Sequence, residues 1–181
     1  GTKDATENWI CLDETCAVPY RIIGVFEETY TDSNNEVKTG ELVKVIRAEQ
    51  QSATQYWNNG GSYNNDWSTA TLKNALNATT GSAEQNVYAT LSSDAKDIVV
   101  KGRWHLGNVV YNNVTASQAY TQERNTATSN LWTDNQPYVD EYVGLIYPSD
   151  YGYAVKEAEC RDVVMFSYDA TAVCHENNWL F

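Results

Sequence analysis

The chain has 181 residues, which suits a single domain built around one hydrophobic core. Its formal net charge of −12 gives a surface that repels nucleic-acid phosphates and anionic lipid headgroups. No apolar run approaches the roughly 18 residues that a membrane-spanning helix needs. We therefore expect one folded domain, with no membrane span and no nucleic acid among its partners.

Two runs rich in β-branched and apolar residues, at 20–26 and 41–48, predict the strands of a β-hairpin. The polar stretch between them, EETYTDSNNEVKTG, is rich in turn-forming residues and predicts a long loop. The Gln-, Asn-, Gly- and Ser-rich residues 49–66 predict an exposed loop. The strand pattern places five side chains near the core: Ile22, Val25, Leu42, Val45 and Ile46.

Three short helices are predicted in the middle of the chain. Apolar residues spaced at i, i+3 and i+4, with Ser or Thr at each beginning, favour helices over strands. Helices of about ten residues are marginal alone, so each must pack on a sheet. The predicted helices and their candidate N-caps are 68–77 (Ser68 or Thr69), 92–101 (Ser92 or Ser93, ending before Gly102) and 115–124 (Thr115 or Ser117).

The last third of the chain adds further strands. YVGLIY at 142–147 is apolar enough for a central strand, which Pro148 would end. DYGYA at 150–154 predicts a tight corner, and VVMF at 163–166 fits either a strand or a buried helical turn. A hairpin, several helices and more strands indicate an α+β fold, in which short helices pack on an antiparallel or mixed sheet.

Four cysteines, an even number in a short chain, favour disulfide bonds. Of the three pairings, we favour Cys11–Cys16 and Cys160–Cys174, which are local in sequence. The second pair closes an interval of about fifteen residues, which contributes roughly 3 kcal/mol in the loop-entropy description. A zinc site is the less favoured alternative, because the two spacings do not form a pair of short C-x2–4-C knuckles. Free thiols are the remaining alternative if the protein comes from an organism that lives without oxygen.

Several segments together resemble a domain repeated across surface and secreted proteins of intestinal Gram-positive bacteria, a family with no established activity. The matching segments, in the family's order, are CLDETC followed by YRIIGVF, NDWSTATLKNALN, YATLSSDAKDIVVKGRWHLG, AYTQER, YVGLIYPSDYGYA and the closing NNWLF. In some members the domain follows a helix similar to a type IV prepilin leader. The resemblance implies an extracellular or cell-surface location and a pilin-like role. A more distant similarity to C-type-lectin-like domains adds a second expectation for the fold.

The resemblance also exposes a difference at the C-terminus. Related chains continue past NNWL into another Trp-containing strand, whereas this sequence ends at Phe181. The chain is therefore expected to be a shortened variant or a fragment, or to receive the missing strand from another molecule. An absent strand would leave an open sheet edge, which invites pairing with another chain.

Two groups of loop residues could bind calcium, because hard cations prefer clustered oxygen ligands. No EF-hand pattern accompanies them, and solvated loop charges are the simpler interpretation. The candidate ligands are Asp32, Asn34, Asn35 and Glu36 in one loop, and Asn64, Asn65 and Asp66 in another.

Aromatic side chains in Asn- and Gly-rich loops could stack on the faces of sugar rings. The tripeptides NDW and NQP faintly resemble the sugar-binding loops of calcium-dependent lectins. The alternative is that the tryptophans anchor the core, which we favour for Trp67 and Trp104. The candidate ligand-binding residues are Tyr56, Trp57, Tyr63 and Trp132.

The two histidines are candidates for acid–base chemistry. His105 stands between apolar neighbours in GRWHLG, which favours a half-buried structural position. His175 follows Cys174, and adjacent residues on a strand point to opposite faces, so a cysteine–histidine pair is not favoured. No residue is therefore assigned a catalytic role.

The sequence favours an extracellular, non-enzymatic surface module: a pilus-like or self-assembling filament subunit, or an adhesin. Its expected partners are further copies of itself or a ligand on a host or bacterial surface. The alternative is a carbohydrate-binding, lectin-like module with calcium as its candidate cofactor. A hydrolase with paired carboxylates comes third, with candidates Asp134, Asp140, Glu141 and Asp150.

Overall fold

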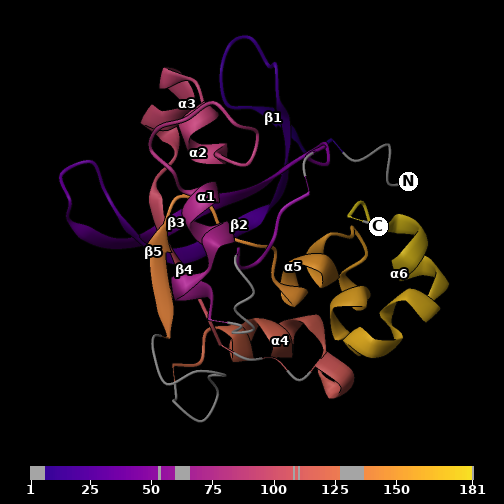
Figure 1. The fold of residues 1–181 in the computed structure, drawn as a ribbon. Helices are drawn as coiled ribbons and strands as arrows, with labels where there is room; N and C mark the ends of the chain where they lie inside the picture. Colours follow the sequence, from indigo (N-terminus) through magenta and orange to yellow (C-terminus); the bar gives the residue numbers. More distant parts are fainter. Residues whose placement is uncertain are drawn as a thin grey trace.

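A five-stranded antiparallel sheet forms the middle of the computed structural model, which describes residues 7–52, 54–59, 66–107, 109, 111–126 and 137–180 (Figure 1). Two long strands that are neighbours in the chain make up most of it. The strands are β1 (Trp9–Cys11), β2 (Pro19–Thr31), β3 (Val37–Arg47), β4 (Lys101–His105) and β5 (Tyr138–Glu141).

Strand β2 connects the others. One of its edges pairs with β3 along almost the whole strand, from Tyr20 opposite Arg47 to Thr31 opposite Val37. The other edge pairs with β1 at the beginning of β2 and with β4 at its last two residues, and β5 continues the sheet beyond β4. Between β1 and β4, no strand of the described residues pairs with this edge, so the sheet has a gap beside the middle of β2.

Strands β2 and β3 form the predicted hairpin, but its loop is much shorter than we expected. The strands include residues 27–31 and 37–40, and only 32–36 form the turn. Alternating Thr, Tyr and Val side chains favour strand structure there in spite of the polar composition. Asp32 closes the turn through its side chain, and Asn35 takes a positive φ of 61°, which asparagine tolerates.

Short helices flank the sheet. Figure 1 shows α5 and α6 together on the right of the strands, with α4 below them and α2 and α3 above the strands. This arrangement confirms the predicted α+β class. No helix within the described ranges is long and apolar enough to cross a membrane. The helices, with 3₁₀ turns written η, are η2 (Trp67–Thr69), α1 (Thr71–Leu76), α2 (Val87–Thr90), α3 (Ser93–Ile98), η3 (Tyr111–Asn113), α4 (Ala116–Glu123), α5 (Pro148–Tyr153), η5 (Ala158–Asp162), η6 (Met165–Ala170) and α6 (Ala172–Asn177).

All three predicted helices are present, and two of them have a predicted cap. The Ser92 hydroxyl accepts from the backbone N–H of Ala95 at the beginning of α3, and Thr115 forms a capping box with Gln118 at the beginning of α4. The expected terminator of α3 was wrong, because Gly102 lies inside β4.

The expected cap of α1 was also wrong. Its N-cap is Ala70, whose side chain cannot accept a hydrogen bond. The carboxylate of Asp66 instead caps the preceding turn η2 by accepting from the backbone N–H of Ser68. Turn η2 leads directly into α1, so the cap acts one turn earlier than the pattern indicated.

The segment at 142–147 is not the central strand that its composition predicted. Strand β5 precedes it, and the segment crosses the ring of Trp104, where a side chain at Gly144 would collide with the indole. Pro148 begins α5 and ends no strand. Gly152 lies in α5, where a β-carbon would collide with Ala116, so the close approach that we expected at this glycine does occur.

The buried apolar side chains form two clusters. One lies around α1 and the loop beyond β5, and the other lies among α5, η5, η6 and α6. The core position expected for Trp67 is confirmed, whereas Val25 is 58% exposed and not in the core. The cluster centres are Trp67, Ala70 and Leu76 in the first, and Val155, Cys160, Tyr168 and Cys174 in the second.

The two faces of the β2–β3 hairpin differ in how much structure covers them. On one face, the Phe26 ring stacks on Tyr120 of α4 with 5.9 Å between ring centroids, and Lys44 reaches α5. On the other face, Val25 and Val43 lie directly opposite each other and are 58% and 53% exposed. The helices therefore cover only one side of this part of the sheet.

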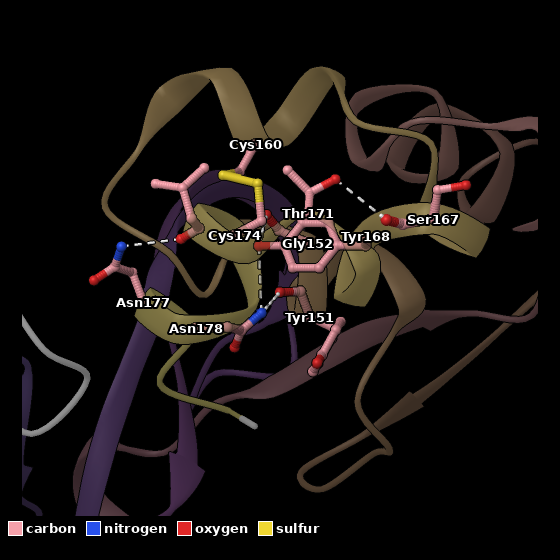
Figure 2. The surroundings of a disulfide bond; sticks show 10 residues. Tyr151, Gly152, Cys160, Ser167, Tyr168, Thr171, Cys174, Asn177 and Asn178 are labelled. Atoms are coloured by element: carbon pink, nitrogen blue, oxygen red, sulfur yellow. Dashed lines mark hydrogen bonds between the residues drawn. A yellow bond between two sulfur atoms is a disulfide. The ribbon is translucent and has the colours of Figure 1, made fainter.

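Two disulfide bonds are present, Cys11–Cys16 and Cys160–Cys174, which is the pairing that the sequence favoured. The second bond links η5 to α6 and packs against the fully buried Tyr168 (Figure 2). The first closes a turn at the end of β1, where both cysteines are exposed. The two bonds therefore differ in the amount of structure that depends on them.

Replacing Cys160 and Cys174 together by alanine should lower the free energy of unfolding by about 2 to 4 kcal/mol, because the bond closes the longer loop. The matched double replacement of Cys11 and Cys16 should lower it by less. Urea unfolding of the two variants measures both values. Equal losses would contradict this ranking.

Candidate functional site

A cavity of about 410 Å³ is lined by residues of the two long strands, of β1 and β4, and of the loop before α5. Cavities of this size with mostly apolar walls are typical of small-molecule sites. The walls come from segments that are far apart in the sequence. They include Ile10 of β1, Phe26 and Glu28 of β2, residues 41–45 of β3, residues 98–100 at the end of α3, Trp104 of β4, and Tyr142 and Tyr147 from the loop before α5.

Lys44 lines this cavity and forms a buried ion pair with Asp150 of α5. The distance from Nζ to Oδ2 is 2.5 Å, and Nζ lies 3.9 Å from the centre of the Tyr147 ring. Burial lowers the pKa of Lys44, although the Asp150 carboxylate opposes the shift. The backbone N–H of Tyr147 donates to the same carboxylate oxygen at 2.8 Å. The ion pair therefore joins β3 to the beginning of α5.

Glu28, on the same face of the sheet, lies beside two basic side chains, Arg124 and His105. Nη2 of Arg124 donates to Oε1 of Glu28 at 2.5 Å, and Nε2 of His105 lies 3.7 Å from Oε2. Burial raises the pKa of Glu28, but the nearby His105 and Arg124 outweigh burial and hold the pKa below its usual range. His105 is thus a mostly buried residue facing an acid. The sequence indicated its burial but not its partner.

Glu123 lies beside this pair and is only 2% exposed. It accepts hydrogen bonds from the backbone N–H of Ser149 at 2.9 Å and from the Ser149 hydroxyl at 2.5 Å. Burial raises the pKa of Glu123, and the hydrogen bonds from Ser149 oppose the shift without cancelling it. The contact joins the last turn of α4 to the first turn of α5.

The buried charges are neutralised by one another. Ser149 and Glu123 are 1% and 2% exposed and do not line the cavity, so their hydrogen bond is closed to a reactant. His175 lies in α6 beside Cys174, whose sulfur belongs to a disulfide.

The acids considered for hydrolysis have cations of their own: Asp140 pairs with Arg103, Glu141 with Lys73 and Asp150 with Lys44, while Asp134 lies outside the described residues.

The first calcium candidate is the turn between β2 and β3. Oδ1 of Asp32 accepts from the backbone N–H of Asn34 at 2.8 Å and of Glu36 at 3.0 Å, and Oδ2 accepts from Nζ of Lys38 at 2.5 Å. The Lys38 contact and these N–H groups lower the pKa of Asp32 to about 2. Both carboxylate oxygens therefore already have donors within the turn.

In the second calcium candidate, only Asp66 belongs to the described part of the chain, and its Oδ1 accepts from the backbone N–H and the hydroxyl of Ser68. Asn64 and Asn65 lie outside it. The described ranges contain no group of three or more His, Cys, Asp or Glu side chains that could hold a metal ion. Calcium binding stays a prediction.

The aromatic residues considered for sugar binding separate into two environments. Tyr56 is 73% exposed, whereas Trp57 is 37% exposed and its ring lies 5.3 Å from that of Trp67. Tyr63 and Trp132 lie outside the described residues. Trp57 therefore serves partly as a core contact, and sugar stacking stays a prediction.

Strand β3 forms one border of the sheet. Within the described ranges it pairs only with β2, so the backbone N–H and C=O groups on its outer side have no partner strand. Val25, Val37 and Val43 project from the face of the hairpin that no helix of the described residues covers, with exposures of 58%, 63% and 53%. Unpaired backbone groups and exposed valines thus lie side by side.

Sequence reasoning did not find the cavity, the charge cluster or the uncovered face. Glu28 and Arg124 are 96 residues apart, and nothing in either segment indicates that they meet. The valines did carry a signal, because Val37, Thr39, Glu41 and Val43 occupy alternate positions, which is the spacing of residues on one face of a strand.

The buried Glu123 yields a first prediction. Replacing Glu123 by alanine leaves two donors of Ser149 without an acceptor and should lower the free energy of unfolding by about 2 to 3 kcal/mol. Replacing it by glutamine keeps an acceptor and should cost less than about 1 kcal/mol.

The raised pKa of Glu123 also sets the direction of a pH effect. Its contribution to stability is full below the unfolded pKa and decreases as pH rises through the folded pKa. Glu123→Gln should therefore become more stable relative to the parent between pH 4 and 7. Thermal unfolding across that range measures the trend, and a constant difference would contradict it.

The hairpin turn yields a second prediction. The Asp32 carboxyl should titrate with a pKa of about 2, so the turn keeps its stabilisation above pH 3.8 and loses it as pH falls through 2. Lys38→Met should raise this pKa toward 3.8, whereas Lys38→Arg should leave it low. Carboxyl NMR titration measures all three proteins, and an unchanged midpoint in Lys38→Met would refute the role of Lys38.

The chain matches no protein-family model, no curated protein and no solved structure. The resemblance to a bacterial surface domain therefore stays a prediction. The function has to be argued from the geometry of the cavity, the charge cluster and the border strand.

Proposed function

We propose that the protein is an extracellular, non-enzymatic surface module that associates with a second copy of itself through β3. The observation that carries this proposal is the unpaired outer edge of β3 beside an uncovered, valine-bearing face of the sheet. Edges of this kind add strands from other chains, since backbone pairing supplies affinity and side chains on alternate positions supply specificity.

Strand β3 is well suited to such pairing. It pairs without irregularity from Val37 to Lys44, because the one shift in register lies at its far end, opposite Ile22 and Gly24. It contains no proline and no bulge in that part, which are two of the features that protect edge strands, although Lys38 and Lys44 place charges on the strand. An incoming strand would therefore meet a regular series of donors and acceptors.

An antiparallel dimer also has a favourable register. A two-fold axis through Gly40, perpendicular to the sheet, keeps each face of one copy continuous with the same face of the other. Val43 of one copy then lies opposite Val37 of the second, and Val25 extends the row. Glycine at the axis removes any side-chain collision there. Moving the axis to Glu41 would instead place like charges opposite each other, Lys38 against Lys44.

The two disulfides support an extracellular location, because such bonds persist in oxidising compartments. The resemblance to bacterial surface proteins points the same way. A two-fold dimer closes after two copies, so a filament would need a second contact between dimers. The dimer would serve either as the repeating unit of a filament or as a paired adhesive surface.

The test changes the exposed valines and measures association. The double variant Val37→Lys and Val43→Lys should weaken self-association at least about tenfold, since charges on an edge prevent strand addition. Phe166→Lys is the matched control, because Phe166 is 70% exposed in η6, away from the sheet. Sedimentation velocity over a concentration series gives the dissociation constants, and electron microscopy shows whether dimers assemble further. A parent protein that stays monomeric, or a valine variant that associates as well as the control, would overturn the proposal.

A further inference from the structure

One buried ion pair is placed so that its two members can react with each other. Nζ of Lys44 in β3 lies 2.5 Å from Oδ2 of Asp150 at the beginning of α5. The two side chains are only 14% and 2% exposed. Nζ also lies 3.9 Å from the centre of the Tyr147 ring and 5.1 Å from that of Trp104. Water therefore has little access to this ammonium and this carboxylate.

An exposed pair in the same hairpin provides a comparison. Lys38 contacts Asp32 at the same distance of 2.5 Å, but the Lys38 side chain is 45% exposed. The hydrogen bond to Asp32 raises the pKa of Lys38, so this amine stays protonated. Burial instead lowers the pKa of Lys44, against the effect of Asp150, and nearby Arg124 acts in the same direction as burial. Lys44 thus loses a proton more readily than Lys38 does.

Burial favours the uncharged form of the Lys44–Asp150 pair. Removal from water penalises both the ammonium and the carboxylate, whereas transfer of one proton from Nζ to Oδ2 leaves two neutral groups. A neutral amine has a free electron pair and is a nucleophile, and the carbon of a protonated carboxyl group is the matching electrophile. The pair therefore contains both partners of an amide bond.

The acid is held in position by its surroundings. The backbone N–H of Tyr147 donates to Oδ2 of Asp150 at 2.8 Å. Ser149, the residue before it, donates its backbone N–H and its hydroxyl to Glu123, which fixes the first turn of α5. Groups held in contact in this way can reach an effective concentration of about 10⁵ to 10⁸ M. Such a concentration offsets the tendency of water to hydrolyse an amide.

We propose that Lys44 and Asp150 condense to an intramolecular amide bond, which joins β3 covalently to α5. Oδ2 receives one proton from Nζ, and the freed electron pair of Nζ attacks Cγ of Asp150. Nζ then gives a second proton to the same oxygen, and the bond from Cγ to Oδ2 breaks to release one water molecule. Nζ keeps its last proton as the N–H of the amide. No atom changes its oxidation state, and both buried charges are removed.

The cavity gives the released water a way out. Lys44 and Tyr147 both line it, so the water is formed at its wall. The walls are mostly apolar, and apolar cavities hold water poorly. Hydrolysis of the amide would require water to return to this site, so the geometry favours the condensed form.

The amide would change how the chain is held together. It would join residues that are 106 apart in the sequence, whereas the disulfides join residues 5 and 14 apart. A cross-link that closes a longer loop restricts the unfolded chain more. The amide would also persist in reducing conditions, in which disulfides open.

Mass spectrometry of the intact chain tests the inference. The folded protein is kept at neutral pH for several days and is then denatured and reduced, so that neither self-association nor the disulfides affect the mass. The mass should be lower than the sequence mass by one water molecule, and a peptide map should contain one branched peptide joined at Lys44 and Asp150. A chain that keeps its full sequence mass overturns the inference, as does a loss of water that maps to other residues.

Three variants identify the reacting groups. Lys44→Arg keeps a cation beside Asp150 but has no nucleophilic amine, so it should keep its full sequence mass. Asp150→Asn should release ammonia in place of water and reach the same final mass as the parent, because both chains form the same amide. Lys38→Arg is the matched control in the exposed pair and should lose water as the parent does. Loss of water from Lys44→Arg would contradict the inference, and the spectrum of the parent decides it alone if a variant does not fold.

Discussion

The structure depends on a group of buried charges between the sheet and helices α4 and α5. Glu28 pairs with Arg124, and Lys44 pairs with Asp150, so both long strands are tied to the helices. Burying an ion costs several kcal/mol, and only a partner with good geometry offsets that cost. Loss of one member would therefore destabilise the fold more than loss of an apolar contact of similar size. These pairs join helices α4 and α5 to one face of the sheet.

Because the helices cover one face of the β2–β3 hairpin, the opposite face is exposed and open to contact with another molecule. Because Lys44 and Phe26 point toward the helices, strand alternation places Val25 and Val43 on the opposite side. In a sheet with a second layer these valines would be core residues, and here they are half-exposed. The proposed dimer would cover part of this apolar surface and pair the outer edge of β3 at the same time. The contacts of the hairpin with α4 and α5 thus explain both why one face of the sheet is covered and why the other face is open to a partner.

The cavity forms where segments that are distant in the sequence meet. Along one edge of β2, the paired strand is β1 at the beginning of β2 and β4 at its end, and these two strands do not meet. Residues from five segments of the chain line the cavity. Gly102 contributes to the open volume, since it places no side chain where one would fit.

Local sequence patterns determined the local structure of this protein. The cysteine spacing, the caps at Ser92 and Thr115 and the hairpin strands all involve neighbours in the chain, so propensity and spacing suffice. Local sequence patterns failed to predict the structure where contacts with residues distant in the chain override local propensity. The apolar segment at 142–147 is held irregular by its passage over Trp104, and the polar residues at 27–31 become strand because β3 and β4 pair with them. The cavity, the charge pairs and the uncovered face join segments that are in places more than a hundred residues apart, and only chain packing decides such contacts.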